Sequence, residues 1–232
     1  MMTTLTLKAQ CEQINWPLHT MHALKIGAGK WKEGQDSDLK PEQVVVTRLA
    51  AENRESCWDE GRGISIVMRA AALDVLTKRS IFNGTQFSPR EDAIRGGFPL
   101  TIKAYKQEIL TCINNISHRQ LQENIAEICA DSVIQHFFKK DYFFKGIIQN
   151  FLSSLADSVD SDFISKIATL RMANPYYGTG WPDLTVIDKN RVSFIEVKTT
   201  DLLHESQLRF AKKIAKPLGL VCCVVQLRPE NY

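Results

Sequence analysis

Residues 180–198 read Gly180-Trp-Pro-Asp-Leu-Thr-Val-Ile-Asp-Lys-Asn-Arg-Val-Ser-Phe-Ile-Glu-Val-Lys198. Residues 184–187 and 192–198 are rich in β-branched and aromatic side chains, which favour strands. The four residues between them, 188–191, are polar and typical of a turn. The segment therefore predicts a β-hairpin.

A four-residue loop fixes the register of this hairpin. Ile187 then pairs with Val192, and Asp183 falls directly opposite Glu196. Because side chains alternate between the two faces of a strand, Glu196 and Lys198 share a face with Asp183, and the apolar side chains project from the other face. The hairpin thus predicts a core on one face and a charged site on the other.

Two opposed carboxylates on a sheet are unfavourable unless a cation lies between them. Mg²⁺ and Mn²⁺ prefer oxygen ligands, so Asp183 and Glu196 suit either ion. Lys198 is then placed to hold an attacking water or a phosphate oxygen. An ordinary surface hairpin is the alternative interpretation, since Glu-x-Lys triplets are frequent in charged sequences. The full set of residues favours a metal-dependent phosphodiesterase.

The composition is that of a folded globular protein of 232 residues, with 44% hydrophobic residues. A net charge of +3 permits nucleic-acid binding without demonstrating it. The six cysteines form no Cys-x-x-Cys pair, which argues against a structural zinc site and favours reduced thiols. There is no secretory signal pattern and no apolar run long enough to span a membrane. We expect a protein of the cytoplasm, bacterial or phage-type, or of the nucleus in a eukaryote, that is not secreted.

A helix is predicted after Trp58-Asp-Glu60-Gly61, because apolar residues recur at helical spacing from Ile64 to Val75. Extended back by one turn, the apolar face of this helix includes Glu60. A carboxylate in that position either compensates the helix dipole or binds a ligand.

A helix is also predicted from Glu42 to Asn53, with Pro41 at its first turn. A third helix is predicted from Asp201, which is a credible N-cap, to Pro217-Leu-Gly219. Gln207 is a polar residue on its otherwise apolar face. It binds a water or phosphate near the metal, or caps a backbone group, and the sequence leaves both roles open. The small apolar residues 220–227 predict a final buried strand. The order of elements predicts an α/β structure with a mixed sheet, and the breaker-poor residues 101–172 predict a helical insertion before the hairpin.

Three blocks appear in order at compatible spacing: Gly180-Trp-Pro-Asp183-Leu, Phe194-Ile-Glu196-Val-Lys198 and Asp201-x-Leu203-x-x-x-Gln207. Together they resemble the virus-type replication-repair nuclease (VRR-NUC) domain of the PD-(D/E)XK superfamily. The segment from Glu60 to Asp74 is similar to a helix in the nuclease domain of Fanconi-associated nucleases. The resemblance covers residues 45–227.

This resemblance implies a restriction-endonuclease-like fold, with a mixed central sheet flanked by helices, and metal-dependent cleavage of DNA that leaves 5′-phosphate ends. Residues 45–232 are then the nuclease domain, and residues 1–44 an N-terminal extension or linker, of which Lys30–Pro41 is expected to be an exposed loop. The cofactor implied is Mg²⁺ or Mn²⁺. The implied site has acidic ligands, a ligating backbone carbonyl, a catalytic lysine and a polar helix residue: Glu60, Asp183, Glu196, Val197, Lys198 and Gln207.

We expect a deoxyribonuclease that selects flapped or branched DNA, acting in repair, recombination or the metabolism of a phage or mobile element. The alternatives are a sequence-specific restriction-type endonuclease that cuts plain duplex DNA, and a non-catalytic DNA-binding module with the same fold. A binding module has no need of opposed carboxylates. Since one domain carries one active site, a second subunit is one way to cut both strands of a duplex. A homodimer is therefore one form to consider, and the sequence leaves the oligomeric state open.

Overall fold

The computed structural model describes residues 6–79, 88–96, 104–140 and 148–230. The chain forms two compact units. We call Met1–Gly61 together with Thr179–Tyr232 the sheet unit, and Arg62–Gly178 the helical unit.

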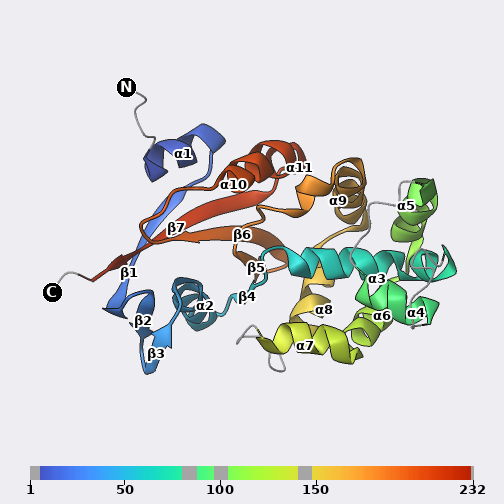
Figure 1. Cartoon of the computed structure of the whole chain (residues 1–232), viewed down its shortest axis with the longest axis horizontal. Helices are drawn as coiled ribbons and strands as arrows, with labels where there is room; N and C mark the ends of the chain where they lie inside the picture. Colours follow the sequence, from blue (N-terminus) through green and yellow to red (C-terminus); the bar gives the residue numbers. More distant parts are fainter. Residues whose placement is uncertain (1–5, 80–87, 97–103, 141–147, 231–232) are drawn as a thin grey trace. The chain divides into compact units, whose positions relative to one another are not determined.

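Among the described residues, the sheet unit contains seven strands and five helical segments (Figure 1). In chain order these are α1 (Leu7–Ile14), β1 (Leu18–Gly27), β2 (Lys30–Glu33), β3 (Asp36–Leu39), α2 (Pro41–Ala51), β4 (Glu55–Trp58), β5 (Leu184–Asp188), β6 (Arg191–Lys198), α10 (Glu205–Phe210), η3 (Ala211–Ala215), α11 (Lys216–Leu218) and β7 (Val221–Pro229).

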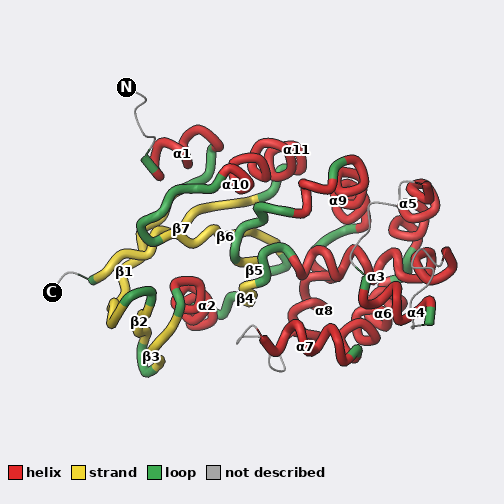
Figure 2. The backbone as a smooth tube through the Cα atoms, in the orientation of Figure 1, coloured by secondary structure: helices red, strands yellow, loops and turns green. Residues whose placement is uncertain are grey.

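The strands form one mixed sheet in the order β3-β2-β1-β7-β6-β5-β4 (Figure 2). β7 is parallel to both of its neighbours, β1 and β6, and the other pairs are antiparallel. The hairpin β5–β6 has the predicted register, because Ile187 pairs with Val192 and Leu184 with Ile195. The α/β fold with a mixed sheet is confirmed.

Helices cover both faces of this sheet (Figure 1). On one face, Val45 and Leu49 of α2 pack in a cluster with the apolar side chains of the hairpin, Leu184, Val186, Ile195 and Val197. On the other face lie α1 and the helix from α10 to α11, where Phe210 contacts both Trp16 and Trp181. The predicted separation of a core face from a charged face is confirmed.

Strand β4 was not predicted, and it lies at the edge of the sheet beside β5. Helix α2 matches the prediction of a helix that has Pro41 in its first turn. The helix after the hairpin begins at Glu205 with His204 as N-cap rather than at Asp201. It ends as predicted at Gly219, whose φ of 64° allows a left-handed cap.

Residues 6–44 form more regular secondary structure than the sequence analysis predicted. The segment expected to be an exposed loop contains β2 and β3, and β1 pairs in parallel with β7 next to the centre of the sheet. The compact sheet unit starts before residue 44 and includes this segment. The strand β1 was not predicted. Only Ala23 along it is buried, so its sequence lacks a regular apolar alternation.

The helical unit follows β4 and precedes β5, which confirms the predicted helical insertion before the hairpin. Its described elements are α3 (Arg62–Arg79), α4 (Pro89–Arg95), α5 (Lys106–Asn115), α6 (His118–Ala130), α7 (Ser132–Lys140), α8 (Ile148–Ser158), α9 (Ser161–Ala173) and η2 (Pro175–Gly178).

Helix α3 is the core of the helical unit and packs against α4, α5, α6, α8 and α9. Its three consecutive alanines, 70–72, are fully buried, and such small side chains let neighbouring helices approach closely. Asp74 on its exposed side pairs with Arg90 at 2.8 Å, and Arg90 also binds Glu127 and Asn124. Asp74 therefore takes part in a network that joins helices.

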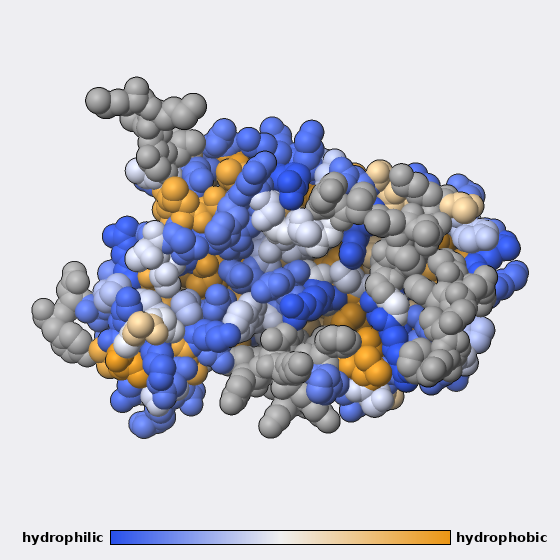
Figure 3. Space-filling view, in the orientation of Figure 1, coloured by the Kyte–Doolittle hydropathy of each residue, from blue (hydrophilic) through white to orange (hydrophobic). Residues whose placement is uncertain are grey.

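The surface seen in Figure 3 is mostly hydrophilic, with smaller apolar areas. Among the described residues, the large apolar side chains that stand exposed are Ile26 and Val221. None of the helices in the described ranges is both long enough and apolar enough to cross a lipid bilayer.

Candidate active site

The chain enters the hairpin through Gly180 and Trp181. Gly180 has a φ of 79°, and a Cβ atom on it would lie 2.2 Å from the carbonyl oxygen of Ser206. Only glycine fits so close to the start of α10. Trp181 is buried and its ring contacts Phe194 and Phe210, with centroid distances of 5.4 and 4.6 Å. These contacts hold the start of β5 against the helix that follows β6.

Asp183 and Glu196 lie next to each other at the end of the hairpin. The backbone N–H of Val197 donates to Oδ2 of Asp183 at 2.8 Å. Burial, and secondly the charge of Glu196, raise the pKa of Asp183 to about 7. Burial likewise raises the pKa of Glu196, against the opposing effect of Lys198. Two deprotonated carboxylates are therefore unfavourable here without a cation.

The two oxygens of Glu196 have different surroundings. Oε1 accepts hydrogen bonds from the Lys198 ammonium, at 2.9 Å, and from the side-chain amide of Gln207. Oε2 is buried and has no hydrogen-bond donor in the part of the chain that the structure describes. Glu196 itself is 1% exposed. A buried carboxylate oxygen without a donor needs a cation or a shared proton, and Asp183 is the neighbouring carboxylate.

Lys198 is buried with its ammonium between two carboxylates, 2.9 Å from Glu196 and 3.2 Å from Asp201. Burial alone lowers the pKa of a lysine, but the attraction of Glu196 and Asp201 outweighs it, so that the pKa of Lys198 is raised. Lys198 therefore stays charged at neutral pH. Asp201, predicted as an N-cap, instead fixes this ammonium.

Of the two roles that the sequence left open for Gln207, the structure shows the backbone cap, together with a contact to Glu196. Oε1 of Gln207 accepts from the backbone N–H of His204 at 2.8 Å, which caps the start of α10. Its Nε2 donates to Glu196. One buried amide thus fixes both the helix and the carboxylate.

Glu60 is exposed and precedes α3 in a left-handed conformation, with a φ of 49°, rather than lying on the helix. Its backbone N–H and that of Asp59 both donate to the carbonyl oxygen of Asp183, at 3.1 and 3.0 Å. Asp59 is buried and accepts from the hydroxyl of Thr185 at 2.7 Å. The turn at Asp59 and Glu60 therefore holds the backbone of Asp183.

Glu42, in the first turn of α2, is a carboxylate that the sequence analysis did not single out. It is half-buried. Its pKa is raised by burial first, then by the charges of Asp183 and Glu60, against a lowering effect of Lys40. Glu42 therefore interacts electrostatically with Asp183 and with Glu60. In the sequence, Glu42 is one acidic residue in the first turn of the predicted helix 42–53. Acidic residues are common in that position, so the pattern did not single out Glu42.

A second residue missed by sequence analysis is Gln10 of α1. Its buried side chain accepts from the backbone N–H of Leu203 at 2.8 Å and donates to the carbonyl oxygen of Leu203 at 3.3 Å. Leu203 lies in the loop between Lys198 and α10. An N-terminal helix thus supports the loop of the candidate site.

The donor set suits a hard divalent cation. The pair formed by Asp183 and Glu196 offers carboxylate oxygens, one of them buried without a donor. Mg²⁺ is commonly held by one or two carboxylates together with waters and substrate phosphates. Within the described ranges, no three His, Cys, Asp or Glu side chains form a group able to hold a metal ion. The structure brings Asp183, Glu196, Lys198 and Gln207 together as a two-carboxylate site.

No protein-family model and no curated protein matches this chain. Solved structures similar to it include two crystal structures of paFAN1 bound to 5′-flap DNA with a gap, one with a flap of 2 nucleotides and one with a flap of 1 nucleotide. Each has a TM-score of 0.55 and 14% identity, and the match covers 94% of this chain and 38% of the paFAN1 chain. The chain shares its fold with part of paFAN1, in agreement with the predicted restriction-endonuclease-like fold.

Proposed function

We propose that this chain is a metal-dependent DNA nuclease with a VRR-NUC-type active site. The observation that carries the proposal is the set of half-buried Asp183 and buried Glu196, Lys198 and Gln207 on one face of the hairpin and its following helix. A pair of neighbouring carboxylates with raised pKa values is costly to maintain, and such groups are concentrated at functional sites.

The protein groups have distinct roles in this proposal. Asp183, held through its side chain by Val197 and through its carbonyl by the turn at Asp59, presents a fixed carboxylate. Gln207 and Lys198 hold Oε1 of Glu196, which leaves Oε2 for the cation. A Mg²⁺ or Mn²⁺ ion bound at these carboxylates would supply charge neutralisation at the scissile phosphate and a water of lowered pKa. The carbonyl of Val197 is a further proposed ligand.

Lys198 is the residue we assign to the reacting phosphate. Its ammonium is charged at neutral pH because two carboxylates stabilise it. A buried cation beside the scissile phosphate stabilises the negative charge that develops on the phosphate oxygens during attack by water. Cleavage of the bond to the 3′ oxygen leaves a 5′-phosphate end.

Flapped or branched DNA is the substrate we propose, and repair or recombination of cellular or phage DNA is the setting. The support is that both similar structures are bound to 5′-flap DNA. The chain spans 38% of the length of paFAN1, so the rest of that protein has no counterpart in this match.

The test is cleavage of labelled 5′-flap, 3′-flap, four-way-junction, single-stranded and plain duplex DNA in Mg²⁺, Mn²⁺ or EDTA. Asp183→Asn and Glu196→Gln are expected to lower cleavage by at least about 100-fold. Each removes a negative charge that binds the metal cation, and the cation in turn neutralises charge on the phosphate. Asp188→Asn is the matched control for Asp183→Asn, because Asp188 is at the other end of β5 and pairs with Arg54.

The substrate ranking separates the rival functions. Equal cutting of branched and plain DNA at one short sequence would identify a restriction-type endonuclease. DNA binding without cleavage in either metal would identify a binding module. Full activity in Glu196→Gln would overturn the assignment of the active site.

A further inference from the structure

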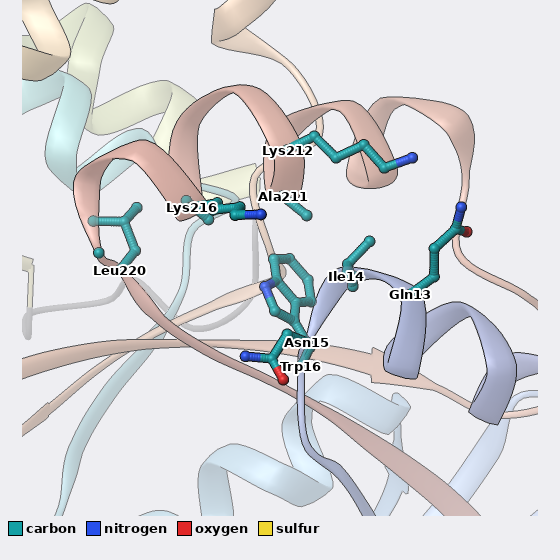
Figure 4. Close-up of a pocket in the computed structure, with 10 residues that line it drawn as sticks. Gln13, Ile14, Asn15, Trp16, Ala211, Lys212, Lys216 and Leu220 are labelled. Atoms are coloured by element: carbon teal, nitrogen blue, oxygen red, sulfur yellow. The ribbon is translucent and has the colours of Figure 1, made fainter.

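A second concave site lies in the sheet unit, between the end of α1 and the helix from η3 to α11 (Figure 4). The cavity has a volume of about 700 Å³, within the range of small-molecule sites. Its apolar lining comes from Ile14, Trp16, Ala211 and Leu220. Figure 4 shows the indole of Trp16 between the two helical segments. The cavity is therefore lined in part by an aromatic ring, that of Trp16, which is 7% exposed.

The rim of this cavity is basic. Lys212 and Lys216 line it on the side of the helix, and the lining residues include no Asp or Glu. In the described part of the chain, the side-chain ammonium of neither lysine has a hydrogen bond or an ion pair, and both side chains are exposed. Two unpaired ammonium groups beside an apolar cavity are complementary to a ligand with an apolar ring and an anionic group.

The lining also offers polar groups that recognise a heterocycle. Gln13 and Asn15 line the cavity at the end of α1, and their side-chain amides carry both donors and acceptors. Asn15 is the left-handed C-cap of α1, and Gly219 is that of α11. A nucleobase has a stacking face and an edge of donors and acceptors, and its phosphate supplies the anion. A nucleotide thus satisfies each feature of the cavity.

The same helix joins this cavity to the candidate active site. Gln207, which binds Glu196, is followed at intervals of four residues by Ala211 and Ala215, which line the cavity. Residues four apart lie on one face of a helix, so the cavity begins about 6 Å along the axis from Gln207. Phe210 lies between, in contact with both Trp16 and Trp181. A short segment of one strand is therefore long enough to reach both the cavity and the candidate active site.

We propose that this cavity binds one nucleotide of a single-stranded segment of the DNA substrate. The base stacks on Trp16, and the phosphate is held by Lys212 and Lys216. A base inside a duplex is stacked and paired on both sides, so a free strand is the form that enters. The proposal rests on the proposed DNA nuclease function and assigns to that function a site for the flap or arm.

The first test measures binding of a fluorescein-labelled oligothymidylate in EDTA by fluorescence anisotropy, over a range of salt concentrations. The double variant Lys212→Ser/Lys216→Ser is expected to bind more weakly and to lower the slope of log K against log salt by about 1.4, or about 0.7 for each phosphate contact. The matched control is Lys32→Ser/Lys213→Ser. Lys213 is exposed on the same helix but does not line the cavity, and Lys32 is exposed on β2.

This control also tests the structural alternative. Lysines near the end of a helix stabilise its dipole, and Lys213 does so as well as Lys212 and Lys216. If the lysines serve only the helix, Lys212→Ser/Lys216→Ser loses more thermal stability than the control, which removes one helix lysine, but the two double variants bind the strand equally. Equal strand binding by the two double variants would overturn the proposal.

The second test observes Trp16 directly. Trp16→Phe assigns the indole N–H resonance in the NMR spectrum, and oligothymidylate is expected to shift that resonance, whereas a duplex of the same length is not. Trp16→Leu is expected to lower strand affinity by about fivefold to 100-fold, and Trp16→Phe to retain most of it, because a stacking ring remains. Thermal melting of each variant confirms that it is folded.

The outcomes separate this proposal from the nuclease function. An unshifted Trp16 resonance in a protein that cleaves flapped DNA would overturn the cavity assignment and leave the nuclease standing. A shift by thymidine monophosphate without binding of the strand would also overturn it, in favour of a free-nucleotide site. Strand binding at Trp16 in a protein that never cleaves DNA would support the cavity while the nuclease function fails.

Discussion

Gln10 and the backbone of Leu203, which are 193 residues apart in the sequence, exchange two hydrogen bonds at 2.8 and 3.3 Å. Gln10 lies in the first helix, and Leu203 lies in the loop that carries Asp201, the partner of Lys198. The amide fits a peptide group because it offers one donor and one acceptor side by side. The N-terminal helix is therefore part of the support of the candidate active site.

Gln10→Ala is expected to lower the free energy of unfolding by about 1 to 3 kcal/mol, because it removes the side-chain partner of the backbone N–H and C=O of Leu203, and both hydrogen bonds are buried. Urea denaturation measures this change. Gln13→Ala is the matched control for stability, since Gln13 is an exposed glutamine one turn along the same helix. An equal, small loss in both variants would contradict a supporting role of Gln10.

Gly180→Ala and Gly219→Ala form a second matched pair. Both glycines have a left-handed φ, of 79° and 64°, so alanine at either position is expected to cost about 1 to 2 kcal/mol of backbone strain. A Cβ at Gly180 meets the backbone of Ser206 at 2.2 Å, whereas none of the described atoms lies within 4 Å of a Cβ at Gly219. We expect an additional loss of about 1 to 3 kcal/mol for Gly180→Ala, as in other overpacked sites.

We also expect the two variants to differ in cleavage activity. Because a displaced Ser206 moves the start of α10, it also moves Gln207 away from Glu196. Cleavage by Gly180→Ala is therefore expected to fall at temperatures where the variant is still folded, and to fall more than cleavage by Gly219→Ala. Circular dichroism establishes the folded range before the assay. Unchanged cleavage by folded Gly180→Ala would contradict the role of this close approach.

Glu42→Gln and Glu60→Gln test which carboxylate joins Asp183 and Glu196. Glu42 is half-buried and electrostatically coupled to Asp183, whereas Glu60 is exposed. We expect Glu42→Gln to weaken Mn²⁺ binding by about 10-fold or more, and more than Glu60→Gln. Isothermal titration calorimetry measures the affinity, with Glu52→Gln at the exposed end of α2 as control. A larger effect of Glu60→Gln would restore the ligand set implied by the family resemblance.

The stability of the metal-free protein is expected to depend on pH through Asp183. Its pKa is raised from 3.8 to about 7 in the folded state, so the stabilising effect of its proton is complete below pH 3.8 and is lost as pH rises to about 7. In EDTA, the melting temperature of the unchanged protein should therefore fall over this range relative to that of Asp183→Asn. Differential scanning calorimetry measures both. Parallel pH profiles of the two proteins would contradict the raised pKa.

The stabilisation of the protein by bound metal is expected to depend on pH in the opposite direction. Binding of Mn²⁺ requires deprotonated carboxylates, so the stabilisation that Mn²⁺ gives should increase as pH rises from about 5 to about 8. Asp183→Asn should show little of this increase. The melting temperature with and without Mn²⁺ at each pH provides the measurement.

The hairpin was predictable from sequence for a local reason. A four-residue turn and strict alternation determine which residues pair, so the register from Ile187 with Val192 to Leu184 with Ile195 follows from residues that are neighbours in the chain. The same local logic predicted helix α2 and the end of the helix at Gly219. Periodicity sufficed because one face of each of these elements is buried.

Strand β1 and the partners of the site residues were not predictable in this way. β1 is largely exposed and acquires its strand conformation by pairing with β7, which is some 200 residues later in the chain. The position of Glu60 also differed, because a left-handed turn before α3 removes it from the helix face. In both cases a contact with a distant segment overrides the local pattern.

The sequence by itself determined the α/β order of elements, the register of the hairpin and the shared face of Asp183, Glu196 and Lys198, because each depends on chain neighbours and on the two-residue period of a strand. The tertiary structure decided the environment of those residues. It buries Glu196, places Gln207 and Lys198 on one of its oxygens, and leaves the other oxygen without a donor among the described residues. It also brings Gln10 to Leu203, because both segments pack against the same sheet. Residues so far apart in the chain show no local pattern that would predict their contact.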